Sequence, residues 1–117
     1  GVDALVSFGM NMLLTHTDGA RGAQALDALD FMVHADLFMT PTASHADIVL
    51  PATTAFERND ISGSPTDRFT AAMSKQIEPL GQARSEFDIF SGLADRFGTL
   101  EGYAEGRDEM GWLEHIY

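Results

Sequence analysis

The first half of the chain alternates short apolar runs with a stretch of helical periodicity. Three apolar runs have the length of buried strands and are each followed by a glycine, an aspartate or a proline: residues 4–8, 30–35 and 47–50. Residues 20–30 predict a helix, because their apolar side chains recur at helical spacing, and Asp18 can cap it. Residues 10–20 predict a loop or a loop with a helical turn, and residues 40–46 a short helical turn. Alternating strands and helices with short links predict a doubly wound, parallel α/β sheet with right-handed crossovers.

The second half has a different pattern. Residues 52–79 are polar and irregular, and a loop of this length is uncommon unless it is functional or covers something. Residues 85–97 predict an amphipathic helix that begins at a capping pair, Ser85 and Asp88, and ends at Gly98. Its large apolar side chains and one alanine lie on one face: Phe87, Phe90, Leu93, Ala94 and Phe97.

The predicted sheet is thin, because it has only three strands. Residues 111–117 have the pattern of another helix that continues to the last residue without a cap, and Trp112 and Tyr117 are large side chains with no predicted neighbour. Both features indicate that this chain is part of a larger structure.

The chain is strongly acidic, with 18 Asp and Glu residues against 7 Lys and Arg and a formal charge of −11. We expect no nucleic-acid partner, because binding to phosphates relies on positive charge, and no contact with anionic membranes. No apolar run approaches the ~20 residues that span a bilayer. The absence of cysteine excludes thiolate metal sites, iron–sulfur ligation and a cysteine nucleophile within this chain.

Polar residues follow the predicted strands at the edge where ligands bind in open α/β sheets. Gly9 lets a ligand approach the backbone closely, and Asn11 offers both a donor and an acceptor. Asp36 can accept hydrogen bonds from ribose hydroxyls or from a base. The alternative for Asp36 is a turn or cap residue, which an aspartate after a strand often is.

Arg58 is the first basic residue after Arg21 and could bind a ligand phosphate in bidentate fashion. The favoured alternative is a salt bridge to Asp60 or Glu57. Neither of the common glycine-rich phosphate loops is present in the sequence.

No metal site and no catalytic residue is predicted. The four histidines lack metal-binding spacing, and His34 is expected to be packed in a strand. Asp36 and Asp47 have no obvious third ligand. Ser44, His45 and Asp47 are too close together in sequence to form a nucleophilic triad.

Several segments in order resemble the molybdopterin oxidoreductase family, the dimethyl sulfoxide reductase-type enzymes that carry molybdenum on two pyranopterin guanine dinucleotides. The strongest are Asp36-Leu-Phe-Met-Thr-Pro-Thr-Ala43, Ala46-Asp-Ile-Val-Leu-Pro-Ala-Thr-Thr54 and Phe56-Glu-Arg-Asn-Asp-Ile61. Gly9-Met-Asn11 looks like the family's Gly-x-Asn-Pro turn, with Met12 in place of the proline. The resemblance covers nearly the whole chain.

The Glu-Arg-Asn-Asp-Ile and Phe-Asp-Ile-Phe segments look most like the S-oxide and N-oxide reductases, which include the dimethyl sulfoxide, trimethylamine N-oxide and biotin sulfoxide enzymes. The resemblance implies that residues 1–117 form a single α/β domain, the later half of the third domain of such an enzyme. This domain is Rossmann-like, with a mostly parallel sheet and flanking helices, and holds the guanosine end of one dinucleotide. The full enzyme would transfer an oxygen atom from an oxide to reduced molybdenum, whereas this chain alone is expected to be inactive.

The resemblance also assigns site residues. Asn11 matches the turn asparagine at the cofactor, and Ala35 and Asp36 match the pair at the second strand end, where the carboxylate meets the nucleoside. Thr15 and His16 lie where some relatives have a ligand-contacting histidine.

Two further residues match family positions in the second half. Arg58 matches a basic position near the cofactor phosphates or base, and Glu86 falls where the family usually has an aspartate on the guanine side. A carboxylate can accept from both guanine N1–H and the exocyclic amine, and so selects guanine over adenine.

The implied partners are the cofactor and the remaining domains of the same polypeptide, which would supply the molybdenum ligand. Bacterial relatives occur in both cytoplasm and periplasm, so the compartment stays open. One alternative is a free-standing nucleotide-binding or interaction domain. Another is a dehydrogenase of the same superfamily, such as a formate-oxidising enzyme, which the Glu-Arg-Asn-Asp-Ile segment disfavours.

Overall fold

The computed structural model describes residues 1–63, 66 and 68–116. The chain divides into two compact units, Gly1–Ala52 and Thr53–Tyr117. Tyr117 of the last predicted helix, and positions 64, 65 and 67 of the predicted long loop, lie outside the described residues.

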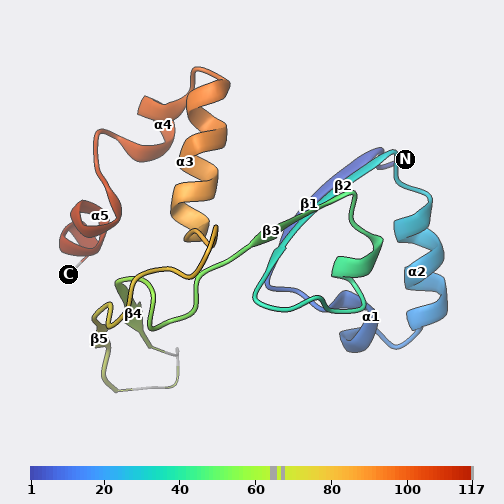
Figure 1. The fold of residues 1–117 in the computed structure, drawn as a ribbon, viewed down its shortest axis with the longest axis horizontal. Helices are drawn as coiled ribbons and strands as arrows, with labels where there is room; N and C mark the ends of the chain where they lie inside the picture. The colour runs from blue at the N-terminus through green and yellow to red at the C-terminus, as the bar shows by residue number, and fades with distance from the viewer. Residues whose placement is uncertain (64–65, 67, 117) are drawn as a thin grey trace. The chain divides into compact units, whose positions relative to one another are not determined.

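The first unit is built on a three-stranded parallel sheet with the strand order β1-β2-β3 (Figure 1). The strands are β1 (Ala4–Phe8), β2 (Phe31–Asp36) and β3 (Ile48–Pro51). β1 and β2 pair in register from Ala4↔Phe31, and β2 and β3 pair from Val33↔Ile48. The predicted α/β fold with a parallel sheet and flanking helices is therefore confirmed.

Short helices connect these strands. α1 (Met12–Thr15) is a single turn in the segment predicted as a loop or helical turn, and α2 (Gly19–Asp27) leads into β2. Asp18 caps α2 as predicted, because its Oδ1 accepts a hydrogen bond from Arg21 N at 3.0 Å. α2 ends three residues before the predicted limit. A 3₁₀ turn, η1 (Ala43–His45), precedes β3.

The two faces of this sheet differ in burial. Met32 and His34 of β2 are 1% and 0% exposed. The intervening positions point to the other face, since side chains alternate along a strand. On that face the register aligns Val6 with Ile48 through Val33, and these two are 49% and 45% exposed. One apolar face of the sheet is thus partly exposed to solvent in this chain.

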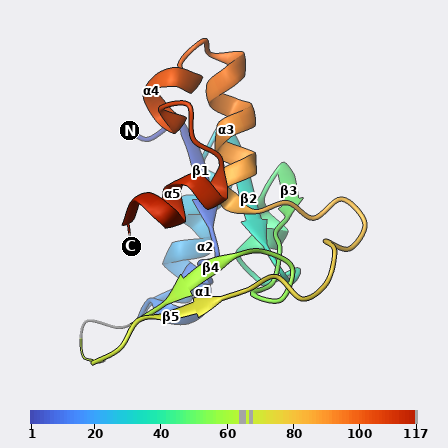
Figure 2. The same ribbon diagram turned by 90° about the vertical axis from the view of Figure 1, so that its left-hand side faces the viewer.

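The second unit begins with a small antiparallel hairpin, β4 (Asp60–Ser62) and β5 (Ala71–Met73), whose central pair is Ile61↔Ala72 (Figure 2). This hairpin lies in the segment predicted as irregular. Each strand has three residues, which is too short for apolar alternation to be recognised.

Three helices follow: α3 (Glu86–Arg96), α4 (Leu100–Ala104) and α5 (Glu109–Ile116). α3 matches its prediction, with Ser85 as the N-cap. α4 was not predicted, and its Tyr103 ring lies 5.8 Å from the ring of Phe87 and 6.2 Å from that of Phe90, measured between centroids. Among the described residues, no helix combines the length and apolar character needed to cross a membrane.

Candidate functional site

The carboxyl ends of β1 and β2 carry the predicted polar residues of the first unit. Gly9 follows β1 with φ +54°, a left-handed conformation that side-chain-bearing residues rarely adopt. Its N–H donates to the carbonyl of Ala35 at 2.9 Å, which fixes the turn against β2. Ala35 is 1% exposed, and its carbonyl is occupied by Gly9 N, so in this structure it shapes the strand end.

Asn11 is held by Thr42, which is fully buried. Thr42 Oγ1 donates to Asn11 Oδ1 at 3.0 Å and accepts from Leu13 N at 3.2 Å. This bond orients the amide and occupies its oxygen. Within the described part of the chain, Asn11 Nδ2 has no hydrogen-bond partner, so it remains a donor for a ligand.

Asp36 ends β2, and its side chain is 12% exposed. Oδ1 accepts from Leu37 N at 2.7 Å and from Phe38 N at 3.4 Å, as a turn residue does. Oδ2 lies 3.2 Å from Nε2 of His34. Asp36 therefore fulfils the turn role that the sequence left as its alternative, and it keeps part of its acceptor capacity.

His34 is packed, as expected, but it is also hydrogen-bonded at both ring nitrogens. Its Nδ1 lies 2.6 Å from Ser7 Oγ on β1. Sequence reasoning missed this link, because Ser7 and His34 are 27 positions apart and only the β1–β2 register makes them neighbours.

His16 is the C-cap of α1 and is exposed. Its backbone N–H donates to Met12 O at 3.0 Å. No hydrogen bond of its ring is found among the residues that the structure describes.

Arg58, in the second unit, is bound by the chain's own oxygens. Its Nε donates to Asp60 Oδ2 at 3.0 Å, and Nη1 donates to the carbonyl of Thr53 at 2.7 Å. Nη1 also lies 3.6 Å from Glu86 Oε2. The salt bridge to Asp60 was the favoured alternative for Arg58, and it is present. The structure also brings together Arg58 and Glu86, the two predicted site residues of this unit.

Glu86 is the first residue of α3, directly after the N-cap Ser85. The exposed N–H groups at a helix N-terminus favour a carboxylate there. The Glu86 side chain is 40% exposed and that of Arg58 is 24% exposed. Both line an open pocket of about 220 Å³, whose walls also include Asp60, Glu109 and Trp112.

This pocket is acidic. One guanidinium, from Arg58, faces carboxylates from Asp60, Glu86 and Glu109. A phosphate group would meet net negative charge there, whereas a ligand that donates hydrogen bonds would find acceptors. The Trp112 ring adds an aromatic wall and is itself held by the Arg107 guanidinium, which lies 4.9 Å from the ring centroid.

Glu57 supports the backbone next to Arg58. It is 5% exposed, and its carboxylate accepts from Thr54 N at 2.7 Å and from Leu80 N at 2.8 Å. These hydrogen bonds, first that of Thr54 and then that of Leu80, lower the pKa of Glu57. Glu57 thus ties two distant loop segments together. Sequence reasoning considered it only as a partner for Arg58.

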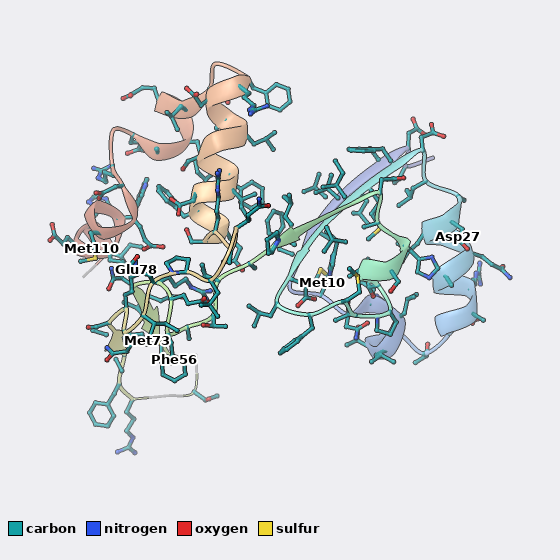
Figure 3. All side chains as sticks on the ribbon, viewed as in Figure 1. Met10, Asp27, Phe56, Met73, Glu78 and Met110 are labelled. Carbon is teal, nitrogen blue, oxygen red and sulfur yellow. The ribbon has the colours of Figure 1, made fainter. Side chains whose placement is uncertain are left out.

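The other arrangements considered from the sequence, a nucleophilic triad and a metal site, are not formed by the described residues. His45 Nδ1 lies 2.6 Å from Asp27 Oδ1 of α2, the residue labelled in Figure 3. Asp47 Oδ2 accepts from Met32 N at 2.7 Å. Ser44, His45 and Asp47 therefore form no triad. Across the described ranges, no group of three or more His, Cys, Asp or Glu side chains is arranged to hold a metal ion.

Comparison with known proteins gives the family. The model of the molybdopterin oxidoreductase family matches residues 1–96. The chain is 45% identical to a biotin sulfoxide reductase of Cereibacter sphaeroides, covering 93% of this chain and 15% of that protein. It is 48% identical to a dimethyl sulfoxide/trimethylamine N-oxide reductase of Rhodobacter capsulatus, covering 93% of this chain and 14% of that protein.

A solved structure agrees with these relatives. The acetylene hydratase from Pelobacter acetylenicus superposes with a TM-score of 0.76 and 31% identity, over 85% of this chain and 14% of that one. The chain thus spans about one-seventh of the length of the proteins it matches. The resemblance seen in the sequence is confirmed, and the chain belongs to the molybdopterin oxidoreductase family.

Proposed function

We propose that this chain holds the guanosine end of a molybdopterin guanine dinucleotide within a molybdenum-dependent oxidoreductase that reduces S-oxides or N-oxides. The observation that carries the proposal is the pairing of Arg58 with Glu86 in the wall of one pocket. Family membership implies a molybdenum–pterin cofactor in the full enzyme, and the relatives quoted above include S-oxide and N-oxide reductases.

The acceptor groups of the pocket fit a guanine better than a phosphate. Glu86 presents a partly exposed carboxylate that can accept from guanine N1–H and from the exocyclic amine. Arg58 lies 3.6 Å from that carboxylate and is anchored by Asp60, so it orients Glu86 rather than offering a free cation. Sequence reasoning left Arg58 near either the phosphates or the base, and the local charge favours the base.

The strand ends of the first unit fit the sugar part of a nucleoside. Asn11 Nδ2 is a donor, and Asp36 Oδ2 is an acceptor at the carboxyl edge of the sheet, where α/β proteins bind nucleotides. Ala35 contributes by fixing the turn after β1, because its carbonyl accepts from Gly9 N. The His16 ring is exposed at the end of α1, and we assign it a contact with the ligand. In this proposal both units belong to one domain of the full enzyme.

The bound cofactor would supply the oxygen-atom transfer, and this chain would supply binding and orientation. None of the proposed site residues is a catalytic residue, so we expect residues 1–117 alone to catalyse no oxide reduction. The rest of the polypeptide would provide the molybdenum ligand and the substrate channel.

The proposal predicts that Glu86→Gln in the full-length protein weakens cofactor retention. The amide keeps the shape but loses the charge and one acceptor oxygen, and a charge-assisted pair of hydrogen bonds is worth roughly tenfold or more in binding. Guanine and molybdenum per protein, measured after gel filtration, give the readout.

Glu101→Gln is the matched control, since Glu101 is an exposed carboxylate of α4 outside the pocket. Its guanine and molybdenum content should equal that of the wild type. Equal contents in Glu86→Gln and the wild type would refute the role of Glu86.

A further inference from the structure

A polar array crosses the buried part of the sheet in the first unit. Ser7 Oγ on β1 lies 2.6 Å from His34 Nδ1 on β2, and His34 Nε2 lies 3.2 Å from Asp36 Oδ2 at the end of β2. His34 is 0% exposed and Ser7 is 5% exposed. Burying these groups is costly unless each is hydrogen-bonded, so the array has a defined geometry.

The direction of each hydrogen bond follows from the chemistry of the groups. An ionised Asp36 carboxylate only accepts, so His34 Nε2 carries a proton and donates to it. In a neutral imidazole Nδ1 is then an acceptor, and the Ser7 hydroxyl donates to it. Asp36 therefore selects the ring tautomer, and the Ser7 hydroxyl completes the array by donating to Nδ1.

The array leaves Asp36 with limited acceptor capacity. A carboxylate has about four lone-pair positions. Oδ1 already accepts from Leu37 N and Phe38 N, and Oδ2 accepts from His34. One position remains, on Oδ2. Asp36 can thus take one hydrogen bond from a ligand, which fits a single hydroxyl and not the paired N–H groups of a guanine edge.

We propose that His34, backed by Ser7, is a positioning residue that sets Asp36 Oδ2 to accept one hydrogen bond from a sugar hydroxyl of the bound nucleoside. This inference rests on the proposed function. It concerns the first unit alone and gives Asp36 a role in binding the sugar rather than in selecting guanine. The array is not a nucleophilic triad, since Ser7 is buried and its hydroxyl is bonded to the ring.

The test uses the full-length protein with its cofactor and measures the rate at which guanine nucleotide is lost on dilution. His34→Leu removes the donor to Asp36, and we expect loss to be roughly tenfold faster, the size of one charge-assisted hydrogen bond. Ser7→Ala keeps the ring and its bond to Asp36 but removes the hydrogen bond that holds Nδ1, so a smaller acceleration is expected. His34→Gln should restore a near-normal rate, because its amide can accept from Ser7 and donate to Asp36.

A double variant separates positioning from general destabilisation. If Ser7 acts through Asp36, Ser7→Ala should add no further acceleration in an Asp36→Ala background. His45→Leu is the matched control, because it breaks another histidine–aspartate pair of the same unit, with Asp27. It should leave the rate unchanged.

Two results would overturn the inference. One is nucleotide loss from His34→Gln that is as fast as from His34→Leu. The other is full additivity of Ser7→Ala with Asp36→Ala. Because Ser7→Ala removes only one hydroxyl, it decides the matter even where His34→Leu fails to fold. Asp36→Ala and Glu86→Gln with wild-type loss rates would instead refute the proposed function itself.

Discussion

At the scale of single residues, the candidate site is made of side chains that the fold already uses. Asp36 accepts from the backbone of its own turn, and Arg58 holds Asp60 and the carbonyl of Thr53. Such bonds fix the orientation of a charged group before a ligand arrives, which lowers the ordering cost of binding. Groups that a ligand can still bind include Asn11 Nδ2 and one lone pair of Asp36 in the first unit, and the exposed carboxylate of Glu86 in the second.

Glu57 provides a testable prediction about a single residue, which concerns how stability depends on pH. Its pKa is lowered from the ordinary value of 4.5, because Thr54 N and Leu80 N bind the ionised form. A lowered folded-state pKa stabilises the native protein above about pH 4.5, and this contribution is lost as the pH falls from there through the folded-state pKa. Glu57→Gln should therefore lower the thermal midpoint of the full-length protein at pH 7.

The difference between Glu57→Gln and the wild type should shrink below pH 4.5. A midpoint difference that is the same at pH 7 and below pH 4.5 would contradict this role. Glu101→Gln, which changes an exposed carboxylate, is the control and should show no difference at either pH.

At the scale of elements, Ser85 offers a direct test of helix capping. Its Oγ accepts from Asp88 N at 3.1 Å at the start of α3, directly before Glu86. Ser85→Ala should cost about 1 kcal/mol of local stability, which corresponds to roughly fivefold faster amide exchange in the first turn of α3. Hydrogen exchange followed by mass spectrometry provides the measurement, with the last turn of α3 as the internal control. Unchanged exchange in the first turn would contradict the cap.

The elements that the sequence predicted are those with a long or strongly patterned signal. The strands of the parallel sheet are continuous apolar runs, and α3 has both a cap and an apolar face. The β4–β5 hairpin and α4 escaped prediction because three to five residues are too few for a period to repeat. The link from Ser7 to His34 depends on strand register, which no local pattern encodes.

The candidate site, too, could be predicted from the sequence only in part. The motif resemblance assigned both Arg58 and Glu86 to cofactor binding, and the structure brings them within 3.6 Å. The sequence could not show which groups of the chain itself would form hydrogen bonds or salt bridges with these charged side chains. The contacts of Arg58 with Asp60 and Thr53 occupy its Nε and Nη1, and they arise only when the loop is folded.

At the scale of the whole molecule, large apolar side chains remain exposed to solvent in both units. Val6, Phe31 and Ile48 on one face of the parallel sheet are 49%, 43% and 45% exposed, and Phe97 at the end of α3 is 75% exposed. Parallel sheets are normally covered on both faces. Relatives about seven times longer than this chain have further polypeptide that can cover such surfaces.

The most direct test is an experimental structure of the full-length protein with its cofactor bound. We expect a guanine within hydrogen-bond distance of the Glu86 carboxylate, beside Arg58. We also expect one sugar hydroxyl on Asp36 Oδ2, with His34 still bonded to that carboxylate. A cofactor whose nucleoside contacts none of these residues would contradict the proposal that this chain holds the guanosine end.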